Sequence, residues 1–254
     1  MLALGTSGIP SPLLRAAGIL VCGALSCITS CRPNKPASIL LFSGAGTSPG
    51  DVAALENILR SHHFTYSMVD SSQLNAMSES QLQTYRLLLV PGGNFVEMGK
   101  SLMPGTPGNV RGAVASGLNY LGICAGAFLA GNSPFNGLNL TNGVSFPFYS
   151  AEGRGIRKAA LWIQTAGEPP LQHYWEDGPA LTGWGDVVGM YPDGTPAIVE
   201  ASVGAGWVIL SGIHPEAPES WRRGMEFRTP ARIANAYTAK LIDAALHRKR
   251  LAHF

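Results

Sequence analysis

Charged residues are scarce in this sequence of 254 residues, at 13% of the chain. Lys and Arg number 18 against 16 for Asp and Glu, and the only basic run is a short one near the C-terminus. Internal repeats, low-complexity tracts and long series of apolar spans are also missing. These absences exclude a fibrous or disordered protein and a multi-pass membrane protein, and they argue against nucleic acid as a partner.

Cysteine is nearly absent outside the N-terminal segment. Three of the four cysteines fall within the first 31 residues, and Cys124 stands alone in the rest of the chain. A disulfide-stabilised fold would spread its cysteines through the sequence, so a disulfide framework is excluded. No group of His, Cys and acidic residues shows the spacing of a metal site, and we expect neither a metal nor a cofactor.

The N-terminal segment has the pattern of an export signal. Residues 16–28 are apolar or small, and this stretch is too short for a standard transmembrane helix. The run that ends at Cys31, Ile-Thr-Ser-Cys, resembles the lipobox of bacterial lipoproteins. We expect a signal peptide over 1–30, a tether over 31–37, and acyl chains on Cys31 that anchor the protein to a membrane facing the periplasm or the exterior. The alternatives are a poorer lipobox at Cys27 and a signal without lipid.

Short apolar runs alternate with amphipathic segments in the first half of the domain, which we place at residues 38–254. The apolar runs predict buried strands over 38–42, 64–69, 87–90 and 120–123. Apolar residues at helical spacing predict helices over 51–60, part of 73–85, 109–116 and 125–130. This alternation predicts an α/β fold with a mostly parallel central sheet covered by helices on both faces.

The second half of the sequence is less regular. Residues 132–185 are rich in Gly, Pro and aromatics, and we expect loops and shorter, partly antiparallel strands there. Residues 197–201 and 206–210 predict a hairpin that turns at Gly204. A closing helix is expected over 228–246, and the basic residues that follow it suit the negative end of a helix dipole.

The run Gly122-Ile123-Cys124-Ala125-Gly126 has the form of a nucleophile elbow. A sharp turn from strand to helix pushes the nucleophile out at the top of the sheet, and glycines on either side avoid clashes. N–H groups at the start of the helix would stabilise a thiolate, and the N–H of Ala125 would receive an oxyanion. The composition gives only about 0.06 chance matches to this pattern. The alternative is a small cysteine buried in the core.

A thiolate nucleophile needs a base, and the base needs a group that orients it. Among the six histidines, His214 follows an apolar strand, and open α/β sheets place their sites at strand carboxyl ends. Pro215 keeps the chain extended, so that Glu216 can approach the imidazole. The alternative is a loop histidine whose hydrogen bonds are satisfied locally.

Two glycines follow the third predicted strand. Gly92 and Gly93 would let backbone N–H groups face a substrate, and Gly93 is the expected second oxyanion donor. An ordinary strand-ending turn explains the same residues equally well.

Together these motifs resemble the class I glutamine amidotransferase-like superfamily. Residues 120–128 are most similar to the N-terminal domain of biotin–protein ligases of the fungal type, which also occurs in stand-alone bacterial proteins. The resemblance covers about residues 38 to 246. It implies a flavodoxin-like three-layer α/β sandwich and a catalytic triad of Cys124, His214 and Glu216.

The resemblance implies a hydrolase that forms an acyl-enzyme at Cys124 with a small-molecule or peptide amide or ester. Two departures limit it: Phe128 stands where glutamine-using relatives carry a glutamine, and the catalytic half of a biotin ligase is missing. The loop at 153–158 only superficially resembles the glycine/arginine loop of such ligases. A lipid-anchored binding protein without turnover, and a redox or chaperone role for Cys124, are the alternatives. The sequence leaves the oligomeric state open.

Overall fold

A computed structural model describes Gly8, residues 37–149 and residues 157–254. Apart from Gly8, the predicted signal peptide lies outside the described residues, as do Cys31, nearly all of the predicted tether and most of the loop at 153–158. Among the helices in the described part of the chain, none is both long enough and apolar enough to cross a bilayer.

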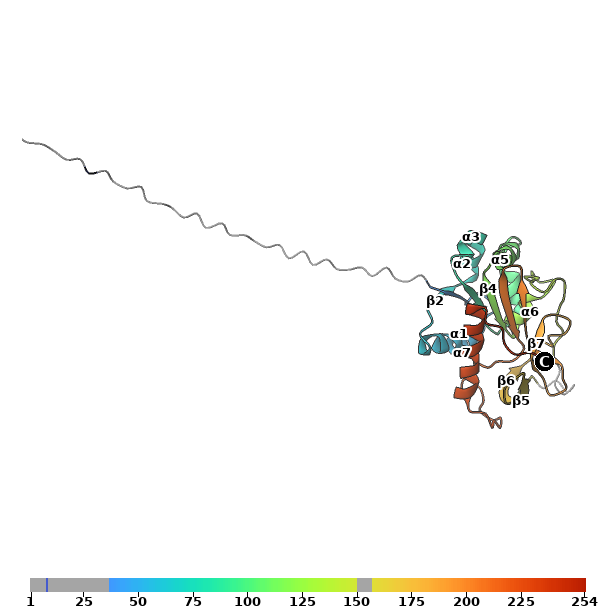
Figure 1. Cartoon of the computed structure of the whole chain (residues 1–254). Helices are drawn as coiled ribbons and strands as arrows, with labels where there is room; N and C mark the ends of the chain where they lie inside the picture. Colours follow the sequence, from blue (N-terminus) through green and yellow to red (C-terminus); the bar gives the residue numbers. More distant parts are fainter. Residues whose placement is uncertain (1–7, 9–36, 150–156) are drawn as a thin grey trace, which may run out of the picture. The chain divides into compact units, whose positions relative to one another are not determined.

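In the described part of the chain, nine strands form one sheet at the centre of the domain (Figure 1). In chain order they are β1 (Ile39–Phe42), β2 (Tyr66–Val69), β3 (Leu87–Val90), β4 (Asn119–Ile123), β5 (Lys158–Thr165), β6 (Leu171–Glu176), β7 (Asp186–Met190), β8 (Pro196–Val203) and β9 (Gly206–Ser211). Their order across the sheet is β2-β1-β3-β4-β9-β8-β7-β5-β6. The pairs from β2 to β9 are parallel, and the pairs from β9 to β6 are antiparallel.

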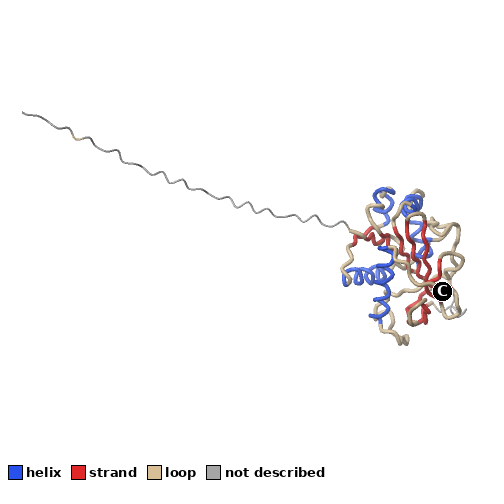
Figure 2. Tube along the Cα trace, in the orientation of Figure 1, coloured by secondary structure: helices blue, strands red, loops and turns tan. Residues whose placement is uncertain are grey.

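Helices cover both faces of the parallel half (Figure 2). One face carries α1 (Pro49–Ser61) and α7 (Ala231–His247). The other carries α2 (Ser71–Ala76), α3 (Glu79–Leu82), α4 (Phe95–Ser101), α5 (Thr106–Ala115) and α6 (Ala125–Ala130). Strand β1 contributes side chains to both faces of the sheet. Ile39 and Leu41 pack into the core under α1 and α7, and Leu40 and Phe42 pack into the core on the other face. A strand that is apolar on both faces belongs in the middle of such a sandwich.

The predicted fold class is confirmed: the domain is an α/β sandwich built on a large central sheet with helices on both faces. The predicted strands and helices before residue 131 are all present, within a few residues at their ends. The hairpin is also confirmed, with Gly204 at a φ of 58° between β8 and β9.

Two elements were not predicted, and one expectation was wrong. Helix α4 and strand β7 had no clear periodicity in the sequence, because each is short. Residues 132–185 were expected to hold loops and shorter, partly antiparallel strands; β5 and β6 do pair antiparallel, but β5, at eight residues, is longer than expected. One side of β5 is exposed, so its sequence lacks the continuous apolar run that marks a strand buried on both faces.

Candidate functional site

Cys124 sits at the turn between β4 and α6, with φ at 49° and ψ at −104°. Residues other than glycine rarely adopt a positive φ, and such a conformation costs about 1 to 3 kcal/mol. The surrounding structure holds it, in part through a 2.7 Å hydrogen bond from the Cys124 N–H to the carbonyl of Ser211 at the end of β9. The backbone strain therefore falls on the residue predicted to be the nucleophile.

The glycines on either side of Cys124 are required by close packing. A Cβ on Gly126 would overlap the carbonyl oxygen of Val90 and lie 2.9 Å from its carbon. A Cβ on Gly122 would lie 2.5 Å from the carbonyl oxygen of Gly126. The spacing of the motif thus follows from how tightly α6 is set against β3 and β4.

His214 lies beyond β9 and is held by the residue predicted to orient it. Its Nδ1 atom is 2.9 Å from Oε1 of Glu216, and both side chains are buried. The backbone N–H of His214 donates to the carbonyl of Tyr174 in β6 at 2.8 Å. Because Nδ1 is engaged, Nε2 is the ring nitrogen left for the cavity that His214 shares with Cys124.

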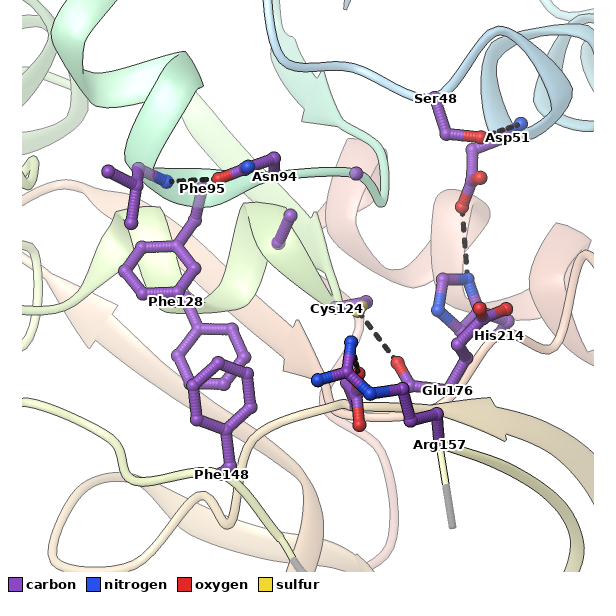
Figure 3. A pocket seen from close by; sticks show the side chains of 14 residues that line it. Ser48, Asp51, Asn94, Phe95, Cys124, Phe128, Phe148, Arg157, Glu176 and His214 are labelled. Carbon is purple, nitrogen blue, oxygen red and sulfur yellow. Dashed lines mark hydrogen bonds and ion pairs between the residues drawn. The ribbon is translucent and has the colours of Figure 1, made fainter. Parts of the chain in front are cut away.

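A second carboxylate, Asp51, approaches the same nitrogen. Its Oδ1 atom lies 3.0 Å from Nδ1 of His214, and the residue is only 4% exposed in the first turn of α1 (Figure 3). Gly92 makes room for this contact, since a Cβ there would overlap Asp51 Oδ1 and lie 2.6 Å from Cε1 of His214. In the sequence, an acidic residue at a helix start is explained by the helix dipole alone, so Asp51 gave no separate signal.

The charges at this cluster favour a protonated imidazole. Burial acts to lower the pKa of His214, but interactions with Cys124, Glu216 and Asp51 outweigh it and raise the pKa well above its ordinary value. Burial raises the pKa of Glu216, which His214 offsets only in part. Burial also acts to raise the pKa of Asp51, but His214 prevails and lowers it. Asp51 is therefore the carboxylate that stays ionised more readily.

Cys124, His214 and Asp51 all line one cavity of about 420 Å³. Gly93 and Ala125, the two predicted oxyanion donors, line it as well. Ala125 is the first residue of α6, where an N–H has no acceptor inside the helix. The volume suits a small-molecule ligand.

The thiol of Cys124 also has a backbone partner. Its Sγ atom lies 3.5 Å from the carbonyl oxygen of Glu176, at the end of β6, and the residue is 6% exposed. Glu176 and the neighbouring Asp177 come from the irregular part of the sequence, which gave no indication that it would form a wall of the site.

The nitrogen of His214 and the carboxylates of Asp51 and Glu216 could also hold a cation, since one ligand atom from each lies within 4.8 Å of the others. The sequence spacing did not predict this group, because Asp51 is more than 160 positions away from its partners. In the described structure these atoms contact one another, so a cation would compete with the contacts that orient His214.

The structure thus brings the predicted site residues together at one edge of the sheet. The residues that line the cavity are Cys124, Ala125, Gly93 and His214. Glu216 contacts Nδ1 of His214, and Gly92 lies against the His214 ring. Sequence reasoning missed Asp51, Phe95 and Phe148, which also line the cavity. An isolated phenylalanine in a loop or a short helix carries no pattern that distinguishes a cavity wall from core packing.

Comparison with known proteins supports the resemblance seen in the sequence. The family model described as biotin-protein ligase, N terminal, matches residues 37–139. No curated protein gives a significant match.

Several solved structures share the fold at low sequence identity. A glutamine amidotransferase is 21% identical, with 70% of this chain and 90% of that chain covered and a TM-score of 0.53. A glutamine amidotransferase from Thermotoga maritima is 14% identical, with coverage of 84% and 90% and a TM-score of 0.51. An exo-beta-1,4-mannosidase from Opitutaceae bacterium strain TAV5 is 16% identical, with a TM-score of 0.53; 81% of this chain is covered but only 35% of the mannosidase.

Proposed function

We propose that this chain, which has a class I glutamine amidotransferase-like fold, is a cysteine-dependent acyl-transfer enzyme. The match to the biotin-protein ligase N-terminal model lies in its first half. The proposed enzyme opens an amide or ester bond through a thioester on Cys124. The observation that carries the proposal is the meeting, at one cavity, of a cysteine in a strained elbow with a histidine held by carboxylates. A cysteine that only fills the core needs neither feature.

In the first step, the thiol proton of Cys124 moves to Nε2 of His214. Glu216 fixes the ring by a hydrogen bond at Nδ1, and Glu216 and Asp51 together stabilise the positive charge that forms. The raised pKa of His214 favours this ion pair at neutral pH. A thiolate is the reactive form of cysteine, so the cluster prepares the nucleophile before substrate arrives.

In the second step, the Cys124 sulfur attacks the carbonyl carbon and a tetrahedral oxyanion forms. The N–H groups of Ala125 and Gly93 are the proposed donors to that oxygen. Collapse of the intermediate breaks the C–N or C–O bond, and the leaving group takes its proton from Nε2 of His214. Water then attacks the thioester with His214 as base, which releases the acid and restores the thiol.

We do not extend the proposal to free glutamine. Phe128 lines the cavity at the position where glutamine-using relatives carry a glutamine, and it offers no hydrogen bond to a polar substrate group. Thioester formation at Cys124 therefore does not by itself specify which acyl group the site accepts.

The first test is the rate of Cys124 alkylation by iodoacetamide from pH 5 to 9, read by mass spectrometry of the peptide that contains Cys124. We expect fast labelling that persists below about pH 7 and falls about tenfold or more in His214→Ala. His62→Ala is the matched control, because His62 is exposed and lies outside the cavity. Labelling that is slow and unchanged in His214→Ala would contradict the proposal.

One contact favours a second candidate function, a binding protein without turnover. The carbonyl of Glu176 lies 3.5 Å from Sγ of Cys124 and accepts a hydrogen bond from a neutral thiol, whereas a thiolate has no proton to donate. Cys124→Ala separates the two candidates. A ligand of the cavity that binds the variant as tightly as the wild type, with no thioester formed by the wild type, would favour binding alone.

We also propose that the protein is exported and held at a membrane by lipid on Cys31. The lipobox-like run before that residue supports this. Metabolic labelling with a fatty acid should mark the wild type and fail to mark Cys31→Ala; equal labelling of both would place the lipid elsewhere.

A further inference from the structure

Three phenylalanine rings form one wall of the cavity beside Cys124 (Figure 3). The centroids of Phe95 and Phe128 are 4.7 Å apart, and their planes are nearly parallel, at 20°. Phe148 completes a three-ring cluster, 4.7 Å from Phe128 at 54° and 6.1 Å from Phe95 at 56°. The rings come from α4, α6 and the loop before the antiparallel strands, so the fold gathers them from three separate segments.

The outermost ring is placed where a ligand can cover it. Phe128 is 5% exposed, but Phe148 is 58% exposed at the cavity. Exposed aromatic surface that continues a buried aromatic stack is favourable to cover, and a planar apolar group can stack on it or meet its edge.

Two polar side chains that line the cavity, Asn94 and Arg157, have partners of their own. Oδ1 of Asn94 accepts hydrogen bonds from the N–H groups of Val96 and Glu97, at 3.1 and 3.2 Å. Arg157 lies 3.6 Å from Asp177. The recognition surface left on this side of the cavity is therefore mainly apolar.

The position of His214 shows which part of a substrate meets the phenylalanine wall. His214 also borders a neighbouring cavity of about 360 Å³, lined in addition by Tyr174 and Trp221 but by neither Cys124 nor the phenylalanines. The leaving group takes its proton from His214 and so lies toward that side. Figure 3 shows Cys124 between His214 and the phenylalanine wall. The acyl group lies on the side of the scissile bond opposite the leaving group, and so it lies against the phenylalanine wall.

We propose that Phe95, Phe128 and Phe148 form an acyl-group subsite that selects substrates with an aromatic or bulky apolar acyl group. This inference rests on the proposed thioester chemistry at Cys124 and adds the class of substrate to it. Phe148 is the specificity-determining residue that the solvent-facing end of the acyl group meets.

The test compares two esters with the same leaving group, p-nitrophenyl acetate and p-nitrophenyl phenylacetate. The Cys124 sulfur attacks the ester carbonyl, the C–O bond breaks, and p-nitrophenolate is released and measured by absorbance. Rates from full-length Cys124→Ala are subtracted to remove reaction at other groups. After correction for the reactivity of each ester with free cysteine, we expect the wild type to prefer the phenylacetyl ester by about tenfold or more.

Phe148→Ala should lower the phenylacetyl rate severalfold more than the acetyl rate, and so lower the preference severalfold. Phe254→Ala is the matched control, because Phe254 is also 58% exposed but does not line the cavity, and it should keep the preference. Phe128→Leu, which retains an apolar side chain in the core, serves as a second subsite variant.

The outcomes separate the two proposals. Acylation of Cys124 that depends on His214 but shows no preference between the esters would overturn the acyl subsite and leave the thioester chemistry standing. A preference that survives both Phe148→Ala and Phe128→Leu would also overturn the subsite. No acylation beyond that of Cys124→Ala would overturn the proposed function itself.

Discussion

The two halves of the sheet contribute to the site in different ways. In the parallel half, β1, β3, β4 and β9 are fully or mostly buried, and the segments after their carboxyl ends supply Asp51, Gly93, Cys124 and His214. In the antiparallel half, β6 supplies the carbonyl of Glu176. The proposed catalytic groups thus lie at the edge where the parallel strands end together, and the antiparallel strands form one wall of the cavity.

Within the parallel half, the elbow should have the lowest tolerance of added volume. In the parallel half, Gly126→Ala forces a methyl group into the carbonyl of Val90, and we expect it to lower the free energy of unfolding by at least about 3 kcal/mol. Denaturant unfolding followed by circular dichroism measures this loss. Gly108→Ala in α5 is the control: no heavy atom lies within 4 Å of the added carbon, and helix propensity predicts a gain of up to about 1 kcal/mol. Similar losses in both variants would show that the elbow is not specially packed.

The antiparallel half holds a histidine whose behaviour is opposite to that of His214. His173 in β6 is fully buried, and within the described residues neither ring nitrogen has a hydrogen-bond partner. Burial, together with the charge of Arg222, lowers the pKa of His173 from 6.5 to about 3. As the pH falls from 6.5 toward 3, the unfolded chain binds a proton that the folded state excludes, so stability is lost on acidification and is fully present above pH 6.5.

His173→Phe should remove this acid sensitivity. Between pH 7.5 and pH 4.5 we expect the wild type to lose about 2 to 3 kcal/mol more of its free energy of unfolding than the variant does. Urea unfolding at the two pH values measures the difference. His62→Phe, at an exposed position, should follow the wild type. An identical pH dependence in wild type and His173→Phe would show that another group controls acid stability.

The smallest expected effect is that of Asp51→Asn. It tests whether one or two carboxylates from the parallel half act on His214. Asp51→Asn keeps the shape of the side chain but removes the carboxylate whose contact with the imidazole helps to raise the pKa of His214. We expect alkylation of Cys124 at pH 6 to fall about tenfold, because the imidazolium that stabilises the thiolate forms less readily. Glu97→Gln is the matched control, since Glu97 is an exposed acid in the first turn of α4. A pH profile for Asp51→Asn equal to that of the control would leave Glu216 as the only group that acts on the histidine.

Prediction from the sequence was most successful where local pattern and packing agree. Strands buried on both faces are continuous apolar runs, so β1, β3 and β4 could be predicted from the sequence. The glycine spacing of the elbow could be interpreted by a steric rule. Strand β5 was harder to recognise, because a strand with one exposed side shares its composition with loops. Asp51, Phe95 and Phe148 gave no signal, because each reaches the cavity through contacts that are distant in sequence.

The sequence by itself determined the order of the strands and helices before residue 131 except α4, the strained turn at Cys124 and the pairing of His214 with Glu216, because each depends on residues within a few positions of one another. Only the tertiary structure decided that Asp51 shares the nitrogen of His214, that Glu176 places its carbonyl beside the thiol, and that three phenylalanines line the far side of the cavity. Those contacts depend on the register of strands and the angles of helices across the whole sheet. Such geometry is fixed by the packing of both cores together and is not encoded in any single segment.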